Sequence, residues 1–363
     1  MFLTEEQKFV IKNVVKDIGS NQIVTCGGVA GTGKSTILKV IKQALKNKGL
    51  NFLSCAFTGK ATNVLTKKGI PSCTIHKAIY QPIKDEKDNV YWIKKDRYHP
   101  DILAIDGFTI DEASTVSLEI HKDLISYGLP IIYIGDHGQL EPVGTDFNLM
   151  KNPMYKLEEI HRNAGEIAYF AHHLRKGNPA VTFKADKQVQ IVKSTAITDR
   201  HLASVDQIIC AFNKTRVQIN QKIREYKNIQ YTYLSEGEKI ICLKNNTREA
   251  LFNGMQGIVT ELIGEDRFSF ISDGELYQNI QFDCEQFGKE TNQFKHGQEA
   301  NPFDYGYSIS CHKSQGSEFD KGIVIEQPCD KWSVTRWNYT AASRFKKGLI
   351  WQAAERYIPK YLG

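Results

Sequence analysis

Short apolar runs alternate with helical patterns in the first part of the chain. Four runs have the length and β-branched content of buried parallel strands: residues 22–26, 51–57, 107–110 and 130–135. Residues 34–48 carry a helical stripe of apolar side chains that stops at Gly49, a residue type at which helices commonly end. Strands that alternate with helices predict βαβ units, in which helices cover a parallel sheet.

A second series of strand-like runs occurs later in the chain, at residues 207–212, 322–326 and 348–352. Residues 232–300, which lie within this series, show alternating strands broken by Gly and Asp and little helical period. We therefore expect two α/β domains, the second interrupted by a small β insertion. The sequence shows no repeat of solenoid period and no low-complexity linker, so the two domains are expected to be closely joined.

Composition sets wide limits on function. The 363 residues are 41% apolar, which is enough for two or three hydrophobic cores. The formal net charge of +6 is compatible with a polyanionic partner and does not identify the anion. The eight cysteines are scattered without CxxC or Cys/His clusters, so we expect reduced core thiols in a cytosol rather than disulfides or zinc ligands. No signal peptide pattern and no apolar stretch near the roughly 20 residues of a membrane span is present, so neither export nor a membrane anchor is expected.

The strongest local signal is a glycine-rich loop at residues 28–35, GVAGTGKS, which matches G-x-x-x-x-G-K-[ST]. It follows a predicted strand and opens a predicted helix, the context in which backbone amides can cradle phosphates. Lys34 would reach the β- and γ-phosphates, and Ser35 would bind Mg²⁺. The alternative is a chance glycine-rich turn. The expected nucleotide contacts are Gly28, Val29, Ala30, Gly31, Thr32, Gly33, Lys34, Ser35 and Thr36.

An acidic pair follows the strand-like run at 107–110. Asp111 stands where a metal-holding carboxylate is needed, and Glu112 where a water-activating carboxylate is needed. Alone, such a pair has little meaning. At the end of a strand downstream of a phosphate loop, it predicts the second half of an ATP-hydrolysis site, with Ser35 and Asp111 as the Mg²⁺ ligands.

Eight segments occur in the order of the motifs of superfamily 1 helicases, and the chain resembles most closely the 5′-to-3′ branch of RecD-like and phage Dda-like enzymes. The segments are GGVAGTGKST, AFTGKATNVL, TIHK, IDEAS, GDHGQLEPV, HRN, YSISCHKSQGSEFD and YTAASRFKKGL. The resemblance spans the chain from Gln7 to Lys346. It implies two RecA-like P-loop NTPase domains, each a parallel sheet with helices on both faces, with ATP between them and single-stranded DNA across both.

The resemblance also implies a division of the chain into four parts. Domain 1A comprises residues 1–77 and 98–165, and a small hairpin insertion, 1B, comprises 78–97. Domain 2A comprises residues 166–231 and 301–363. A β-barrel insertion of SH3-like type, 2B, comprises residues 232–300, and in the relatives it helps to hold the hairpin in place.

Two arginines are implied to contact the γ-phosphate, one from each side of the nucleotide. They are Arg162, between the third and fourth motifs, and Arg344, in the last motif. A guanidinium placed there stabilises the charge that develops during phosphoryl transfer. The alternatives are a helix-surface arginine for Arg162 and the basic edge of a last strand for Arg344. The resemblance assigns to Gln139 the task of sensing the γ-phosphate.

Further nucleotide contacts are implied by residues outside the phosphate loop. Gln7 matches the adenine-reading glutamine, and its alternative role is an ordinary helix-start residue after a Thr4 cap. Glu318 matches the residue that faces the ribose, and Gly316 offers a backbone amide. One position departs from the pattern, because His161 stands where many relatives have a tyrosine before the arginine.

Residues of three motifs are implied to line the DNA track with hydroxyl, imidazole and ammonium groups: Thr58, Lys60, Thr74, His76, Ser310, His312 and Lys313. Each alone is equally well read as a satisfied loop residue. Residues 80–96 predict a β-hairpin. The relatives carry a strand-separating pin here, so Tyr91 or Trp92 is expected either to stack on the junction base pair or to pack the hairpin onto domain 1A.

The expected function is an ATP-driven, Mg²⁺-dependent 5′-to-3′ DNA helicase or translocase that acts as a monomer or as a loose assembly. Two alternatives stay open: a DNA-stimulated ATPase that displaces bound proteins without unwinding, and, more remotely, a small-molecule P-loop kinase. The expected partners are single-stranded DNA and single-strand/duplex junctions, and a single-strand-binding protein or replisome component fits the same reading. The expected location is the bacterial cytosol, which for a phage protein is that of the host.

Overall fold

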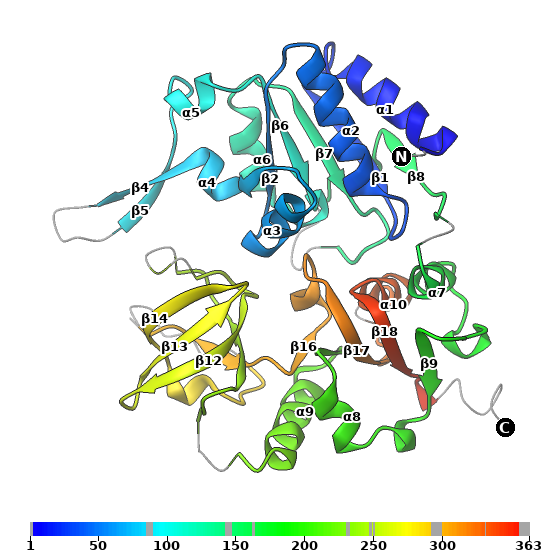
Figure 1. Cartoon of the computed structure of the whole chain (residues 1–363), viewed down its shortest axis with the longest axis vertical. Helices are drawn as coiled ribbons and strands as arrows, with labels where there is room; N and C mark the ends of the chain where they lie inside the picture. Colours follow the sequence, from blue (N-terminus) through cyan, green and yellow to red (C-terminus); the bar gives the residue numbers. More distant parts are fainter. Residues whose placement is uncertain are drawn as a thin grey trace. The chain divides into compact units, whose positions relative to one another are not determined.

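The computed structural model describes residues 3–84, 90–141, 147–161, 164–229, 233–246, 249, 251–291, 300–330 and 332–355, with the backbone alone for Lys60, Lys84, Val90 and Tyr91. The chain forms two compact units, Met1–His172 and His173–Gly363 (Figure 1). None of the helices formed by these described residues is both long and apolar enough to cross a lipid bilayer.

The first unit is built on a six-stranded parallel sheet. Its strands, in spatial order, are β3 (Ser72–Thr74), β2 (Phe52–Ala56), β6 (Gly107–Asp111), β7 (Ile131–Gly135), β1 (Ile23–Gly28) and β8 (Tyr155–Leu157). The helices of this unit are α1 (Glu5–Asp17), α2 (Lys34–Asn47), α3 (Gly59–Lys67), α4 (Ile75–Ile79), α5 (Pro100–Leu103), α6 (Leu118–Ile125) and α7 (Glu166–Arg175). Helix α7 continues into the second unit. A 3₁₀ turn at Ala113–Thr115 follows β6. The predicted parallel α/β organisation is therefore confirmed.

Both faces of this sheet are buried, which explains the continuous apolar runs in the sequence. On β7, Ile132 and Ile134 belong to the core cluster that includes α1 and α2, whereas Ile131 and Tyr133 belong to the core on the opposite face. Neighbouring side chains of a strand point to opposite faces, so a strand with both faces covered must be apolar at every position. The carboxyl ends of the parallel strands meet at one edge of the sheet, where binding sites of such sheets form.

A two-stranded antiparallel hairpin extends from the first unit (Figure 1). It consists of β4 (Tyr80–Lys84) and β5 (Val90–Lys94), in the register Tyr80 to Lys94 and Pro82 to Trp92. The predicted turn between the strands lies outside the described residues.

The second unit contains a five-stranded parallel sheet. Its strands, in spatial order, are β16 (Ser308–Ser310), β10 (Gln207–Cys210), β17 (Phe319–Ile325), β18 (Phe345–Gln352) and β9 (Val189–Val192). Its helices are α8 (Asp199–Ser204), α9 (Asn213–Tyr226) and α10 (Val334–Ala342), with 3₁₀ turns at Ala180–Thr182, Ser194–Ala196, Cys284–Gln286 and His312–Ser314.

A five-stranded antiparallel sheet interrupts this second unit. The strands, in spatial order, are β14 (Glu275–Gln281), β13 (Arg267–Ser272), β12 (Gln256–Ile263), β11 (Lys239–Cys242) and β15 (Phe303–Tyr305). Phe268, Phe270 and Phe303 are fully buried, and their rings lie 5.0–5.8 Å apart. These aromatic side chains belong to one hydrophobic core that continues into α9, β10 and β17 of the second unit.

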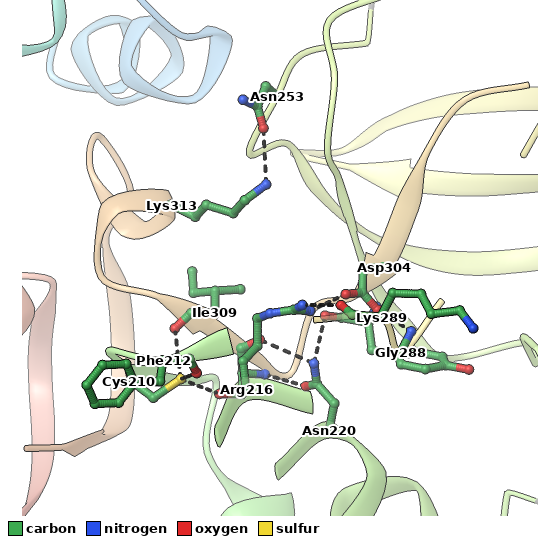
Figure 2. Close-up of polar contacts among 12 residues, drawn as sticks. Cys210, Phe212, Arg216, Asn220, Asn253, Gly288, Lys289, Asp304, Ile309 and Lys313 are labelled. Carbon is green, nitrogen blue, oxygen red and sulfur yellow. Dashed lines mark hydrogen bonds and ion pairs between the residues drawn. The ribbon is translucent and has the colours of Figure 1, made fainter. Parts of the chain in front are cut away.

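A buried polar cluster ties the antiparallel sheet to helix α9 (Figure 2). Arg216 forms an ion pair with Asp304, which is fully buried, and also donates to the Lys289 carbonyl at 2.6 Å. The second carboxylate oxygen of Asp304 accepts from the Gly288 amide at 2.9 Å. Because both charged groups are paired and hydrogen-bonded, their burial is tolerated.

Replacing Arg216 with alanine is expected to lower the free energy of unfolding by about 3–5 kcal/mol, because the buried Asp304 carboxylate would lose its counter-charge. Urea denaturation followed by circular dichroism measures this change. Lys347→Ala removes the exposed ion pair with Asp320 and is the matched control, with a midpoint expected to stay nearly unchanged. Equal shifts for the two variants would contradict a stabilising role for the buried pair.

Candidate functional site

The glycine-rich loop connects the end of β1 to the start of α2, as the sequence predicts. Gly33, at the N-cap of α2, has the left-handed φ of 78°, which favours glycine. A Cβ added to Gly28 would lie 2.8 Å from Thr32 Oγ1 and 2.9 Å from Lys34 Cγ, so no larger residue fits there. The loop therefore leaves its backbone amides and the start of α2 free of bulky side chains, as a phosphate cradle requires.

Lys34 lies folded across its own loop. Its ammonium group donates to the Gly28 carbonyl at 2.9 Å and to the Val29 carbonyl at 3.3 Å, and it is 3.6 Å from the carboxylate of the buried Asp136. Asp136 directly follows β7 and accepts from the Gly138 amide. The sequence analysis missed Asp136 as the partner of Lys34, although its position after a buried strand was a usable signal.

Ser35 is bound by a second cation that the sequence analysis did not name. Lys68, just after α3, donates to Ser35 Oγ at 3.0 Å. Lys68 also lowers the pKa of Asp111, as does Lys34. A positive charge is thus bound to the hydroxyl and acts on the carboxyl that were predicted as metal ligands.

The acidic pair lies at the carboxyl end of β6. Burial and the neighbouring Glu112 carboxylate raise the pKa of Asp111 to about 6. Glu112 has a left-handed φ of 52°, an uncommon conformation for a residue that is not glycine. Among the described residues, its buried Oε2 atom has no hydrogen-bond partner. An unsatisfied buried carboxylate oxygen on a residue with a strained backbone is typical of a group that binds a ligand or a water molecule.

The two glutamines that were predicted as nucleotide contacts are both buried. Gln139 is buried, at 3% exposure, in the segment after β7. Gln7 is also buried. Its side-chain oxygen, Oε1, accepts from the Thr4 backbone amide at 3.2 Å, and its side-chain nitrogen, Nε2, donates to the Thr32 backbone carbonyl at 2.9 Å. The predicted Thr4 capping box is therefore present, and the same side chain also reaches the phosphate loop. Arg162 lies outside the described residues.

Arg344 follows helix α10 in the second unit and is only 5% exposed. Its guanidinium donates to the carbonyls of Thr340 and Ser317 and to Ser343 Oγ. None of the ion pairs within the described part of the chain includes Arg344. It is thus a buried cation held by neutral acceptors.

The two other predicted nucleotide contacts of the second unit lie near one another in sequence. Glu318 forms an ion pair of 2.5 Å with Lys346 and is half-exposed. Gly316 has a left-handed φ of 71°, which favours glycine at this turn. The turn leads directly into β17.

The predicted DNA contacts of the first unit follow strands β2 and β3 at the carboxyl edge of the sheet. Thr58 and Thr74 cap helices α3 and α4, where they accept from the amides of Ala61 and Lys77. His76 lies between the rings of two aromatic residues, Phe57 at 5.8 Å and Tyr80 at 5.5 Å, and burial lowers its pKa. The side chain of Lys60 lies outside the described residues.

The predicted DNA contacts of the second unit lie at and just after β16. Ser310 ends the strand, and His312 and Lys313 form the following 3₁₀ turn. Lys313 donates to Asn253 Oδ1 of the antiparallel insertion at 3.2 Å (Figure 2). Burial and the nearby Arg216 lower the pKa of Lys313 to about 8.

An aromatic pair that the sequence analysis missed stands beside His312. The ring of Trp332 is 6.5 Å from the His312 ring and 5.6 Å from the ring of Phe212, which is 39% exposed. Nothing local in the sequence places these three residues together, because they come from three separate segments.

The hairpin residues named as a separation pin are described in part. Trp92 lies on β5 and is half-buried, and its indole nitrogen is buried without a hydrogen-bond partner among the described residues. The side chain of Tyr91 lies outside the described residues.

A glycine-rich loop between a strand and a helix, with acidic residues ending another parallel strand of the same sheet, defines the class of P-loop nucleoside triphosphatases. The particular family follows from comparison with known proteins. A family model described as an AAA domain matches residues 2–196, more than half of the chain, so the chain belongs to this family.

Relatives confirm the resemblance to RecD- and Dda-like superfamily 1 helicases. The ATP-dependent RecD2 DNA helicase of Deinococcus radiodurans is 24% identical over 353 residues, which cover 89% of this chain and 45% of that protein. The ATP-dependent DNA helicase dda of Enterobacteria phage T4 is 32% identical over 191 residues, which cover 48% of this chain and 43% of that protein. The chain thus spans less than half the length of these two relatives.

Solved structures of Pif1 helicases share the fold. The Bacteroides Pif1 helicase in complex with ADP-AlF3 and ssDNA has a TM-score of 0.58 at 22% identity, over 97% of this chain and 93% of that chain. Bacteroides Pif1 bound to ssDNA has a TM-score of 0.56 at 19% identity, over 99% and 96%. The expected fold of RecA-type helicases is therefore confirmed at the level of two α/β units with parallel sheets.

Proposed function

We propose that this chain is an ATP-dependent DNA helicase or translocase that moves 5′ to 3′ on single-stranded DNA and is driven by Mg-ATP hydrolysis. The observation that carries the proposal is Arg344. It is a buried arginine held by neutral oxygens, in a chain that also has an intact phosphate loop and an acidic pair whose second member, Glu112, has a left-handed φ. A buried cation of this kind is suited to meet an anion that arrives with the substrate.

The residues of the first unit support nucleotide hydrolysis. Lys34 would exchange the carbonyls of Gly28 and Val29 for the phosphates of ATP, with the Asp136 carboxylate beside its ammonium group. Glu112 would orient the attacking water through its unsatisfied oxygen. We assign Gln139 to the γ-phosphate and Gln7 to the base.

The residues of the second unit, together with Arg162, would complete the site. Arg344 and Arg162 would stabilise charge on the γ-phosphate, and Glu318 and Gly316 would contact the ribose. We propose this division of labour as a consequence of the family resemblance.

Mg²⁺ fits the donor set. Among the described residues there is no cluster of three or more His, Cys, Asp or Glu side chains that could hold a metal. Mg²⁺ in nucleotide sites needs few protein ligands, because waters and phosphates supply the rest. Ser35 Oγ already accepts from the Lys68 ammonium as a stand-in cation. Burial and the neighbouring Glu112 carboxylate raise the pKa of Asp111, and a bound cation would oppose both effects. When bound, the ion would neutralise phosphate charge.

The proposal extends to DNA. RecD2 and Dda carry the name DNA helicase, and solved Pif1 structures contain ssDNA. We assign the DNA track to loops that follow β2, β3 and β16, which carry the predicted contacts. The four-part division is part of the same proposal, with the antiparallel sheet as an SH3-like 2B and the β4–β5 hairpin as 1B. The proposal also includes a monomeric state, a cytosolic location and a partner that is a single-strand-binding protein or a replisome component.

The test measures ATP hydrolysis with and without single-stranded DNA, in parallel with unwinding of duplexes that carry only a 5′ or only a 3′ tail. We expect strong stimulation by DNA and opening of the 5′-tailed duplex alone. Hydrolysis that does not respond to DNA would contradict the proposal and favour a small-molecule kinase. Opening of the 3′-tailed duplex would contradict the polarity.

Replacing Trp92 with alanine is expected to abolish unwinding while leaving DNA-stimulated ATP hydrolysis within about twofold, if its indole stacks on the junction base pair. Gel-based unwinding and a coupled hydrolysis assay on one preparation measure both rates. Tyr98→Ala, which changes an exposed tyrosine after the hairpin, is the matched control and should leave both rates unchanged. Unwinding that survives in the Trp92 variant would mean that this residue only packs the hairpin.

Absence of unwinding in the wild type, with DNA-stimulated hydrolysis present, would favour the alternative function of displacing bound proteins.

Binding of single-stranded DNA is expected to weaken about 3- to 10-fold between pH 7 and pH 9, because Lys313 loses its charge as the pH rises through its pKa of about 8. The charged groups around Lys313 are Arg216 and Asp304, with the thiol of Cys242 and the amide of Asn253 nearby. Fluorescence anisotropy with a labelled oligonucleotide measures the affinity. Lys313→Arg keeps its charge at both pH values, so its affinity should change much less. An identical pH dependence in both proteins would exclude Lys313 as a phosphate contact.

A further inference from the structure

The side-chain amide of Gln7 uses both of its N–H donors within the protein. Its Oε1 accepts from the Thr4 amide at 3.2 Å, which fixes the orientation of the amide plane. One hydrogen of Nε2 is donated to the Thr32 carbonyl at 2.9 Å. The second is directed at His161 Nε2, 2.7 Å away. Since a carboxamide has two N–H donors, neither is left to read a base.

The partner of this second hydrogen is held against the phosphate loop. The His161 backbone amide donates to the Gly31 carbonyl at 3.1 Å, and its carbonyl accepts from the Ala164 amide at 2.8 Å. Because Gln7 donates, His161 Nε2 must be the unprotonated ring nitrogen, and Nδ1 carries the hydrogen. A Cβ on Gly33 would lie 2.6 Å from Gln7 Nε2 and 3.0 Å from His161 Nε2, so the loop packs directly beneath this pair.

We propose that His161 is a specificity-determining residue that holds the Gln7 amide in the nucleotide-free protein and gives up this hydrogen bond to the purine base when ATP binds. The inference rests on the proposed ATPase function. Adenine presents an acceptor nitrogen next to an amino donor, and a glutamine amide pairs with both. When the base binds, Gln7 Nε2 exchanges one acceptor, His161 Nε2, for another, the ring nitrogen of the base. The base therefore adds less to the affinity for ATP than it would if the Gln7 amide had no partner to give up.

Replacing His161 with phenylalanine tests this exchange, because phenylalanine keeps a flat ring and removes the acceptor. We expect the imido analogue of ATP to bind about 3- to 10-fold more tightly, the value of one ordinary hydrogen bond. The analogue of GTP should gain less, because guanine presents an oxygen acceptor where adenine has its amino donor. Isothermal titration calorimetry with Mg²⁺ measures both dissociation constants.

Two controls separate this role from a structural one. In a Gln7→Ala background, the His161→Phe change should no longer alter the affinity for the ATP analogue, because the group that His161 holds is gone. His201→Phe makes the same chemical change at the start of α8 in the second unit, where the histidine contacts Thr198, and should leave nucleotide affinity unchanged. Unchanged or weaker ATP binding in His161→Phe, or an equal effect in both backgrounds, would overturn the inference.

Imidazole ¹⁵N chemical shifts of the wild-type protein provide a test that needs no variant to fold. We expect His161 in the Nδ1–H form with Nε2 as acceptor, and a shift of its Nε2 signal on addition of ATP. A protonated Nε2 in the nucleotide-free protein would overturn the inference. The failure of the proposed function is distinguishable, because it would appear as wild-type hydrolysis that does not respond to DNA, whatever the state of His161.

Discussion

Replacing Arg344 with alanine is expected to lower the turnover number for ATP by about 10³-fold or more while ATP still binds. In phosphoryl transfer, an arginine that reaches the γ-phosphate contributes on the order of 10³–10⁵ to the rate, because it offsets charge that develops only in the transition state. Arg344 is suited to this role because it is buried and its hydrogen-bond partners are neutral oxygens. Single-turnover hydrolysis and calorimetric binding of an ATP analogue measure the two quantities separately.

The control for this experiment is Arg336→Ala, on the same helix α10. It should retain wild-type turnover. Because Arg344 also donates to the carbonyls of Thr340 and Ser317, the thermal midpoint of each variant must be measured as well. Unchanged turnover in a folded Arg344→Ala protein would show that the arginine only stabilises the turn before β18.

Replacing Glu112 with glutamine is expected to lower the turnover number by about 10²- to 10⁴-fold, the usual contribution of a general base. Glutamine has nearly the same shape, so affinity for ATP and for DNA should remain close to that of the wild type. The buried, unsatisfied Oε2 of Glu112 is the atom that would accept the proton or orient the water. Steady-state hydrolysis in the presence of saturating single-stranded DNA measures the effect.

Glu119→Gln serves as the matched control, because Glu119 is an exposed residue in the first turn of α6. Its turnover should equal that of the wild type. The Glu112→Gln protein should also be more stable than the wild type. The substitution removes the negative charge of Glu112, which, together with burial, raises the pKa of Asp111. A Glu112→Gln protein that hydrolyses ATP normally would require another group to activate the water.

Much of the fold was predictable because its strands have a clear pattern. The four runs predicted for the first domain occur as β1, β2, β6 and β7, and all four are buried on both faces. The strands that the sequence analysis missed are shorter, such as β8 and β16 with three residues each. A segment of this length has no measurable period, and its pairing is decided by neighbours that are distant in the sequence.

The candidate site was predictable where the chemistry is local. The phosphate loop and the acidic pair are each contained in a short segment, so their motifs could be read directly. The partners that the structure adds come from elsewhere in the chain: Asp136 reaches Lys34 from the end of the adjacent strand β7, and Lys68 reaches Ser35 from the end of α3. His161 was named only for its departure from the family pattern, since its contact with Gln7 joins residues 154 positions apart. The individual roles of these residues stay predictions until the variants are measured.

The first and last strands of the antiparallel insertion, β11 and β15, pair with one another, with Ile240 opposite Tyr305. The chain therefore leaves the second parallel-sheet unit and returns to it at neighbouring points. An inserted module with adjacent ends can be lost, acquired or exchanged during evolution without disturbing the order of the host strands. The same property makes the module a natural unit for engineering. Insertions of related chains could be grafted between the ends of β11 and β15, provided that the graft keeps Asp304 opposite Arg216 and the apolar side chains that the insertion shares with α9.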